Sequence, residues 1–174
     1  WAFEGFSAPS VGPLARTGTP WHWYADDSAA VGCGWTSPQP YSRHDVAVID
    51  MAPGISAARL EAMLTPRPEA VLLRAYGVGN VPSDEPGLTD VIADVLHDGV
   101  PVVIASQCQQ AEVLLGHYET GDAIARAGAI GSGDMTLEAT YAKIMFLLSQ
   151  GVTGADFGKW MHTSIAGEIS PSSL

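Results

Sequence analysis

From residue 45 onward, short apolar runs alternate with amphipathic stretches along the chain. Residues 46–50, 70–74 and 102–104 lack polar alternation, as strands buried on both faces of a parallel sheet do. Helices are expected between them, one capped by Ser56 and running to Leu64 before Pro66, and one that begins beyond Ser83 and ends at Gly99. This alternation predicts βα units around a mostly parallel sheet.

The last third of the chain predicts three more helices. A helix over residues 122–127 stops at Gly128, the longest helix runs from Thr136 to Leu148, and a final one spans about 153–164. The glycine-rich residues 128–133 resemble a phosphate cradle, because small residues let backbone amides approach an anion. They follow a predicted helix instead of a strand and lack the P-loop lysine, so we interpret them as a tight turn between helices.

The first 44 residues follow neither a helical nor a strand period. They contain four of the five tryptophans and several prolines, which predicts an irregular arm or interdomain connector (1–44) before an α/β domain (45–174). Aromatic side chains on such a segment are costly to leave in water. The arm is expected to pack either on its own core or on a surface of an absent domain or subunit. The chain starts at Trp1 without an initiator methionine, so we expect it to be part of a longer protein.

Composition narrows the classes of function. The formal net charge of −11 argues against a basic phosphate-binding face, so nucleic acid is not an expected partner. Cys33 and Cys108 are too few for a disulfide framework and are expected to be reduced. No apolar run approaches the roughly 20 residues that span a bilayer. We expect a cytoplasmic protein without a membrane segment, and the five scattered histidines predict neither a metal site nor a cofactor.

Candidate chemistry lies in the loops after the second and third predicted strands, at the edge where open α/β sheets bind ligands. Arg74 ends an apolar run, and its guanidinium suits either a ligand carboxylate or an ion pair with a neighbouring acid. Asn80 either presents its amide from a glycine-rich loop or forms a turn. Ser106 or Cys108 with a histidine such as His97 or His117 would make a nucleophile and base, but the spacing contains no nucleophile elbow.

Several short segments resemble, in order, the C-terminal half of two-domain bacterial L-asparaginases of the cytoplasmic type. The resemblance covers about residues 45–170 and rests on residues 73–80, 106–108, 118 and 121, 127–131, 134–136, 138–139 and 167–168. It implies a small flavodoxin-like three-layer α/β domain. The arm fits less closely, although residues 1–3 and 7–9 look like the segment that leaves the N-terminal domain of such enzymes.

In that family, a threonine nucleophile in the N-terminal domain hydrolyses L-asparagine to L-aspartate and ammonia. The motifs of that catalytic domain are absent here, so the resemblance implies no catalytic residue in this chain and no activity without the missing N-terminal domain. It also implies a homodimer or homotetramer. Asn80 and Glu112 match positions that support substrate binding in a neighbouring subunit.

Some family members also bind L-asparagine at a regulatory site. The resemblance places Arg74, Tyr76 and Cys108 there, although Ala111 replaces the usual glycine after this cysteine. Three alternatives remain open. They are a binding or assembly domain without catalysis, the asparaginase-like subunit of a tRNA-dependent amidotransferase, and an intrinsic amidohydrolase that uses Ser106 or Cys108.

Overall fold

The computed structural model of the chain describes residues 13, 15–24, 32–82, 84–115 and 122–170. Its centre is a four-stranded parallel sheet in the order β3-β4-β5-β6. The strands are β3 (Val46–Asp50), β4 (Ala70–Ala75), β5 (Val102–Ser106) and β6 (Ile130–Gly131). The helices are α1 (Ala57–Met63), α2 (Leu88–His97), α3 (Asp122–Arg126), α4 (Leu137–Ser149) and α5 (Gly154–Met161).

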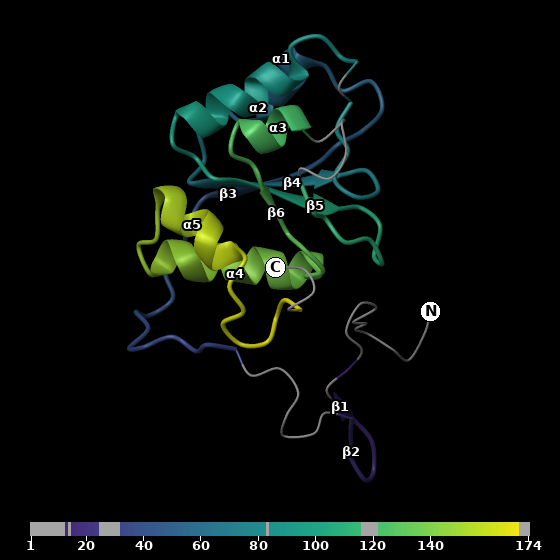
Figure 1. Cartoon of the computed structure of the whole chain (residues 1–174), viewed down its shortest axis with the longest axis vertical. Coiled ribbons are helices and arrows are strands. Elements are labelled where there is room, and N and C mark those ends of the chain that lie inside the picture. Colours follow the sequence, from purple (N-terminus) through teal and green to yellow (C-terminus); the bar gives the residue numbers. More distant parts are fainter. Residues whose placement is uncertain (1–12, 14, 25–31, 83, 116–121, 171–174) are drawn as a thin grey trace.

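The helices form a layer on each face of the sheet, with α1, α2 and α3 on one side and α4 and α5 on the other (Figure 1). Each strand lies beside the preceding one in the sheet. Because crossovers between parallel strands share one hand as a rule, a sheet that grows in one direction is expected to carry its three connecting helices on the same face. The C-terminal helices α4 and α5 cover the opposite face. One buried cluster therefore includes Leu73 and Ile104, and a second includes Leu72 and Phe157. The predicted three-layer α/β fold is confirmed.

Most predicted helix ends follow from local hydrogen bonds. Ser56 Oγ accepts a hydrogen bond from Arg59 N at 3.2 Å, and Thr136 Oγ1 accepts one from Ala139 N at 3.2 Å. The helix expected beyond Ser83 starts later, at Leu88 after Gly87, and Ser83 lies outside the described residues. Helix α5 is shorter than predicted and ends at Met161.

The glycine-rich residues 128–133 do not form a tight turn between helices, and that interpretation was wrong. They contain β6, in which Ile130 pairs with Val103 and Gly131 pairs with Ile104. A Cβ atom at Gly131 would overlap the carbonyl oxygen of Val113, because the chain after β5 crosses close to the strand. Glycine, which has no Cβ atom, allows the two backbones to lie this close together. A two-residue strand that includes glycine leaves no apolar run for a sequence pattern to reveal.

The described part of the arm contains a short antiparallel hairpin of β1 (Ala15–Arg16) and β2 (His22–Trp23), which the sequence did not predict. It lies apart from the three layers (Figure 1), and Trp21 and Trp23 are 58% and 67% exposed. Trp35, in contrast, packs on the domain's own core, with its ring centroid 4.4 Å from that of Trp160. Trp1 lies outside the described residues. The domain boundary at residue 45 stays a prediction.

Candidate functional site

The Arg74 guanidinium lies at the carboxyl end of β4 and pairs with an acid on the neighbouring strand. Its Nη1 atom is 2.8 Å from Asp50 Oδ1 and 3.1 Å from Oδ2. Asp50 and Arg74 are the last register pair between β3 and β4, which places both side chains on one face of the sheet. The side chains of Arg74 and Asp50 are 28% and 61% exposed. Of the two predicted partners for Arg74, the structure contains the neighbouring acid.

Two buried polar atoms at this edge of the sheet lack hydrogen-bond partners among the described residues. They are Arg74 Nε and the Tyr76 hydroxyl oxygen. An unsatisfied buried donor costs about 1 to 3 kcal/mol, so such groups need a physical explanation. An arginine and a tyrosine with unused hydrogen-bonding capacity favour a ligand that carries oxygen atoms.

Gln107 connects the ends of three strands, and sequence reasoning gave it no role beyond membership of a resembling segment. Its Nε2 atom donates to Met51 O at 2.6 Å and to Arg74 O at 2.9 Å. Its backbone N–H donates to Ala75 O at 2.9 Å. The side chain thereby sets the positions of the backbone on both sides of the Asp50–Arg74 pair. An amide after a predicted strand was the available signal, but its target carbonyls lie far away in sequence.

Ser106 has a structural role in the loop that carries Cys108. The Ser106 hydroxyl donates to Gly77 O at 2.5 Å and accepts from Cys108 N at 2.9 Å. Cys108 is a free, exposed thiol, and Cys33 is also free, as predicted. Within the described residues, neither Ser106 nor Cys108 hydrogen-bonds to a histidine, and His117 lies outside them. The base that either nucleophile would need is therefore not supplied by the described part of the chain.

A different serine does contact a histidine, at the opposite edge of the sheet. Ser42 Oγ and His44 Nε2 are hydrogen-bonded at 2.8 Å, and His44 Nδ1 lies 3.2 Å from the Glu69 carboxylate. Glu69 also accepts a hydrogen bond from Asp45 N at 2.7 Å, and this bond, followed by the one to His44, lowers the pKa of Glu69. These residues precede β3 and β4, so they join the end of the arm to the amino edge of the sheet, away from the candidate ligand edge.

The proposed substrate-supporting residues Asn80 and Glu112 both lie in loops near the carboxyl edge of the sheet and are half-buried. The Asn80 backbone pairs with Tyr76 in both directions, with N–O distances of 2.8 Å, and closes a tight loop. Gly79 adopts a φ of +113° inside that loop. Glu112 precedes Val113, whose backbone forms a bridge with Gly133. The backbone geometry of residues 76–80 matches the turn-forming alternative, while the role of each side chain toward substrate stays a prediction.

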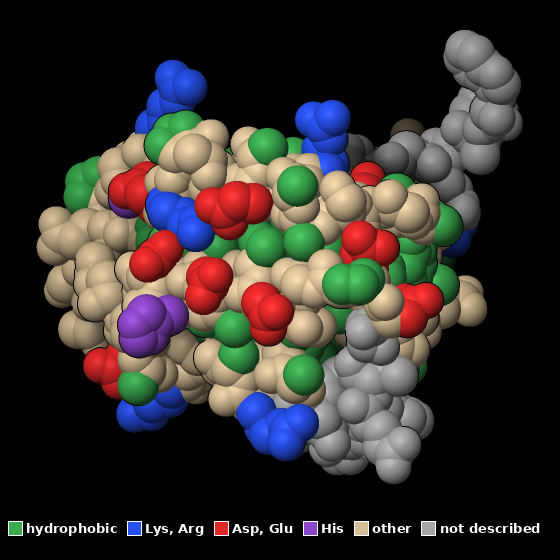
Figure 2. All heavy atoms as spheres, turned by 90° about the horizontal axis from the view of Figure 1, so that it is seen from above, with side chains coloured by type: hydrophobic (Ala, Val, Ile, Leu, Met, Phe, Trp, Pro, Cys, Tyr) green, Lys and Arg blue, Asp and Glu red, His purple; other side chains and the backbone are tan. Residues whose placement is uncertain are grey.

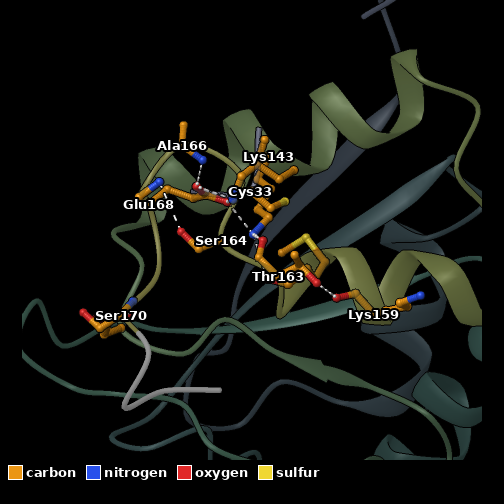
Figure 3. Close-up of polar contacts among 12 residues, drawn as sticks. Cys33, Lys143, Lys159, Thr163, Ser164, Ala166, Glu168 and Ser170 are labelled. Atoms are coloured by element: carbon orange, nitrogen blue, oxygen red, sulfur yellow. Dashed lines mark hydrogen bonds and ion pairs between the residues drawn. The ribbon is translucent and has the colours of Figure 1, made fainter. Parts of the chain in front are cut away.

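A second polar cluster joins α4 to the C-terminal segment (Figure 3). Lys143 Nζ lies 2.5 Å from Glu168 Oε1 and donates to the carbonyl oxygens of Met161 and Thr163 at 3.0 and 2.8 Å. These two carbonyls sit at the end of α5, where the unpaired backbone oxygens of a helix need donors. Sequence reasoning missed Lys143, because a lysine inside a helical pattern is expected on the surface.

The surroundings of this ion pair shift the pKa values of both of its members. Burial lowers the pKa of Lys143, although the hydrogen bond and the charge of Glu168 oppose the shift. Burial alone raises the pKa of Glu168, but the hydrogen bond from Lys143 and those from the backbone N–H groups of Ala166 and Ile165 outweigh it, so that pKa is lowered. The same segment holds the arm, because Cys33 N donates to Ser164 O at 2.8 Å. This cluster stabilises the fold and lies outside the candidate ligand edge.

The side of the molecule that carries α1 and α2 presents several acidic side chains among apolar and neutral ones, and most of its basic side chains lie toward the rim of the view (Figure 2). Arg67 lies between an acid of α1 and an acid at the end of α2, with Nε 2.8 Å from Asp98 Oδ2 and Nη1 3.0 Å from Glu61 Oε1. These hydrogen bonds raise the pKa of Arg67. Among the described residues, no three histidine, cysteine or acidic side chains could hold a metal ion together, and no helix is long and apolar enough to cross a membrane.

Comparison with known proteins relates the chain to amidohydrolases. The model of the glutaminase/asparaginase C-terminal domain matches residues 45–161. L-asparaginase 1 of Escherichia coli (strain K12) is 35% identical over 169 residues, which are 97% of this chain and 50% of that protein. A glutamyl-tRNA(Gln) amidotransferase subunit of Pyrococcus furiosus is 33% identical over 126 residues, 72% of this chain and 28% of that protein.

The solved structures agree. L-asparaginase I from Vibrio cholerae O1 superposes with a TM-score of 0.81 at 32% identity, over 98% of this chain and 52% of that one. The chain thus spans about half the length of the L-asparaginases that it matches. Its three-layer fold, its loops at the carboxyl edge and the match over residues 45–161 show that the chain belongs to the glutaminase/asparaginase family and carries that family's C-terminal domain.

Proposed function

We propose that this chain is the C-terminal domain of an L-asparaginase, which hydrolyses L-asparagine to L-aspartate and ammonia. The observation that carries the proposal is the similarity to L-asparaginase 1 along 97% of the chain. The threonine nucleophile is supplied by the N-terminal domain that the resemblance implies. At the carboxyl edge, neither Ser106 nor Cys108 is paired with a histidine among the described residues, which supports the proposal that the chain is inactive without that domain.

The test is ammonia release from L-asparagine by the purified 174-residue chain, with its intact mass checked in the same sample. We expect no release from the chain alone. Release is expected once an N-terminal half from a related L-asparaginase is added, with Asn80 and Glu112 supporting the neighbouring active site in a homodimer or homotetramer. Ser42→Ala should leave that release unchanged, because Ser42 lies at the opposite edge. Sustained release by the chain alone overturns the proposal.

The domain also binds L-asparagine at a regulatory site that includes Arg74, Tyr76 and Cys108. Support comes from the unsatisfied Arg74 Nε and Tyr76 hydroxyl and from the exposed Cys108 thiol on a loop fixed by Ser106. A guanidinium fork binds a carboxylate through two parallel hydrogen bonds, while a small thiol leaves room for the amide end of the ligand.

Calorimetric titration of the chain with L-asparagine tests this site. We expect saturable binding that Arg74→Gln weakens by about tenfold or more. The matched control is Arg67→Gln, because Arg67 is bound by two acids before the start of β4 and should not affect binding at its carboxyl end. Absence of L-asparagine binding overturns the regulatory site.

A second candidate function is that of the asparaginase-like subunit of an amidotransferase that forms glutaminyl-tRNA. The 33% identity to the glutamyl-tRNA(Gln) amidotransferase subunit of Pyrococcus furiosus favours it, although the match covers only 72% of this chain. The two functions differ in the fate of ammonia, which a transferase partner consumes in the second case. Co-purification of such a partner would favour the amidotransferase. In either case we propose a cytoplasmic location, which two free thiols support.

A further inference from the structure

We propose that Asp50 and Arg74 together recognise a free α-amino acid, with Arg74 binding the α-carboxylate and Asp50 binding the α-ammonium group. This inference rests on the proposed regulatory site and adds its selectivity. Asp50 makes the site specific for ligands that carry both charges. A ligand with the same carboxylate and amide but without the ammonium group contacts Arg74 and makes no ion pair with Asp50.

The position of Asp50 suits this role. It is the last residue of β3, an outer strand of the described sheet, and is paired in register with Arg74. Neighbouring strands lie about 4.8 Å apart, so an acid and a base in register present opposite charges at short range. The two charges of an α-amino acid are separated by a single carbon atom. An acid beside a base at the open edge therefore matches the spacing of the ligand's own charges.

The Asp50–Arg74 contact leaves the guanidinium under-used. Both carboxylate oxygens of Asp50 contact the single atom Nη1, at 2.8 and 3.1 Å, and Nε has no partner among the described residues. A fork–fork contact, in which two nitrogens face two oxygens, is the geometry that an arginine and a carboxylate adopt when they are optimally paired. The pair is thus incomplete until a second carboxylate is supplied.

Arg67 shows what a structural arginine looks like in the same chain. Its Nε atom donates to Asp98 at 2.8 Å, and its Nη1 atom donates to Glu61 at 3.0 Å. The side chains of Arg67 and Arg74 are similarly exposed, at 29% and 28%. The difference between them is therefore one of pairing and not of burial.

Opening the Asp50–Arg74 pair for a ligand is inexpensive. The Asp50 side chain is 61% exposed, and ion pairs in such surroundings contribute little because water screens both charges. The guanidinium must turn outward to offer Nε to the ligand. One ion pair is then exchanged for two, from Arg74 to the ligand carboxylate and from the ligand ammonium to Asp50.

The experiment compares L-asparagine with succinamate, which is asparagine without its ammonium group, by calorimetric titration of the 174-residue chain. Asp50→Asn removes the charge and keeps the shape. We expect the wild-type chain to bind L-asparagine about tenfold or more tightly than succinamate. Asp50→Asn should bring the ratio of the two affinities close to one by lowering the affinity for L-asparagine. Succinamate should bind at least as tightly as before, because Arg74 is no longer paired with a carboxylate.

The control is Asp98→Asn, the same substitution beside Arg67, which should leave both affinities and their ratio unchanged. The ratio of the two affinities is informative because a general loss of folded protein reduces the binding of both ligands equally. A wild-type chain that binds neither ligand overturns the regulatory site and this inference together. A wild-type chain that binds L-asparagine, with Asp50→Asn keeping the same preference over succinamate, overturns the role of Asp50 and leaves the regulatory site standing.

Discussion

Lys143 and Glu168 form an ion pair inside the protein, with Nζ and Oε1 2.5 Å apart. The lysine side chain is only 3% exposed, and the same Nζ atom donates to the backbone of Met161 and Thr163. One ammonium group thus connects the middle of α4 to the end of α5 and to the C-terminal segment. Because Cys33 is hydrogen-bonded to Ser164 in that segment, the pair also fixes part of the arm.

Replacing Lys143 with methionine should strongly destabilise the domain. The substitution keeps an unbranched side chain but removes the counter-ion of Glu168 and the side-chain donor of two carbonyl groups. Removing one member of a buried ion pair costs about 3 to 5 kcal/mol. The measurement is the free energy of unfolding in urea. Lys159→Met on the exposed face of α5 is the control and should change that energy by less than about 0.5 kcal/mol. Equal effects of the two substitutions would contradict the structural role of Lys143.

The pH dependence of stability should contain a contribution from Glu168. Its pKa in the folded protein is lowered from the ordinary value of 4.5. A carboxylate of this kind stabilises the fold at a pH above its unfolded pKa, and the stabilisation is lost as the pH falls through the lowered folded pKa. Glu168→Gln should therefore be less stable than wild type at neutral pH and should lose less stability on acidification. Parallel stability curves for the two proteins between neutral and acidic pH would disagree with this assignment.

Two glycines should respond to alanine in opposite directions. At Gly131 a Cβ atom would overlap the carbonyl oxygen of Val113, so Gly131→Ala must displace either β6 or the loop beside it. We expect a loss of about 2 kcal/mol or more in the free energy of unfolding. At Gly158, inside α5, the nearest atom to a new Cβ is Ile130 Cγ1 at an ordinary 3.6 Å. Gly158→Ala should stabilise by about 0.5 to 1 kcal/mol. Destabilisation of the same size at both positions would refute the close approach at Gly131.

The same glycine illustrates how far the sequence predicts the fold. Three strands were evident because apolar runs such as residues 70–74 are long and contain β-branched or aliphatic residues. Strand β6 was missed because its two residues include Gly131, whose place depends on the distant Val113 backbone. The hairpin of the arm was missed for a similar reason. Two-residue strands have no period that a pattern can display.

The candidate site was predictable in part. Arg74 lies near the end of one buried strand and Cys108 follows another, so topology alone placed them at the carboxyl edge. The partner of Arg74 was not predicted as Asp50, since the register between β3 and β4 pairs these two residues only in the folded sheet. Gln107 was missed because its side-chain targets are backbone carbonyls, and Lys143 was missed because a lysine inside a helical pattern is expected on the surface. A sequence shows which side chains are donors, but it does not show which carbonyl groups lack one.

Replacing the Gln107 side chain should lower both the free energy of unfolding and the affinity for L-asparagine. Gln107→Glu keeps the size of the side chain but replaces the donor to Met51 O and Arg74 O with an acceptor. Met51 O loses the donor that Gln107 supplies, while Arg74 O keeps only its hydrogen bond from Met51 N, and these losses should cost about 1 to 3 kcal/mol of folding free energy. L-asparagine affinity should also fall, because the backbone that carries Arg74 is no longer held. The exposed Gln109→Glu adds the same charge to the same loop and should change neither quantity. Unchanged binding in Gln107→Glu would show that Gln107 does not position Arg74.

The tryptophans of the β1–β2 hairpin should drive self-association of the isolated chain. The rings of Trp21 and Trp23 are stacked with centroids 6.0 Å apart, and both are largely exposed. A two-stranded hairpin is marginally stable on its own in water and gains stability when its apolar surface is covered. We expect the sedimentation coefficient to rise with protein concentration and to become concentration-independent in the double variant Trp21→Ser/Trp23→Ser. Trp35 already packs against Phe146 and Trp160, so the hairpin variant leaves the core intact and its thermal unfolding should be unchanged. A wild-type chain that stays monomeric at high concentration would contradict association through the hairpin.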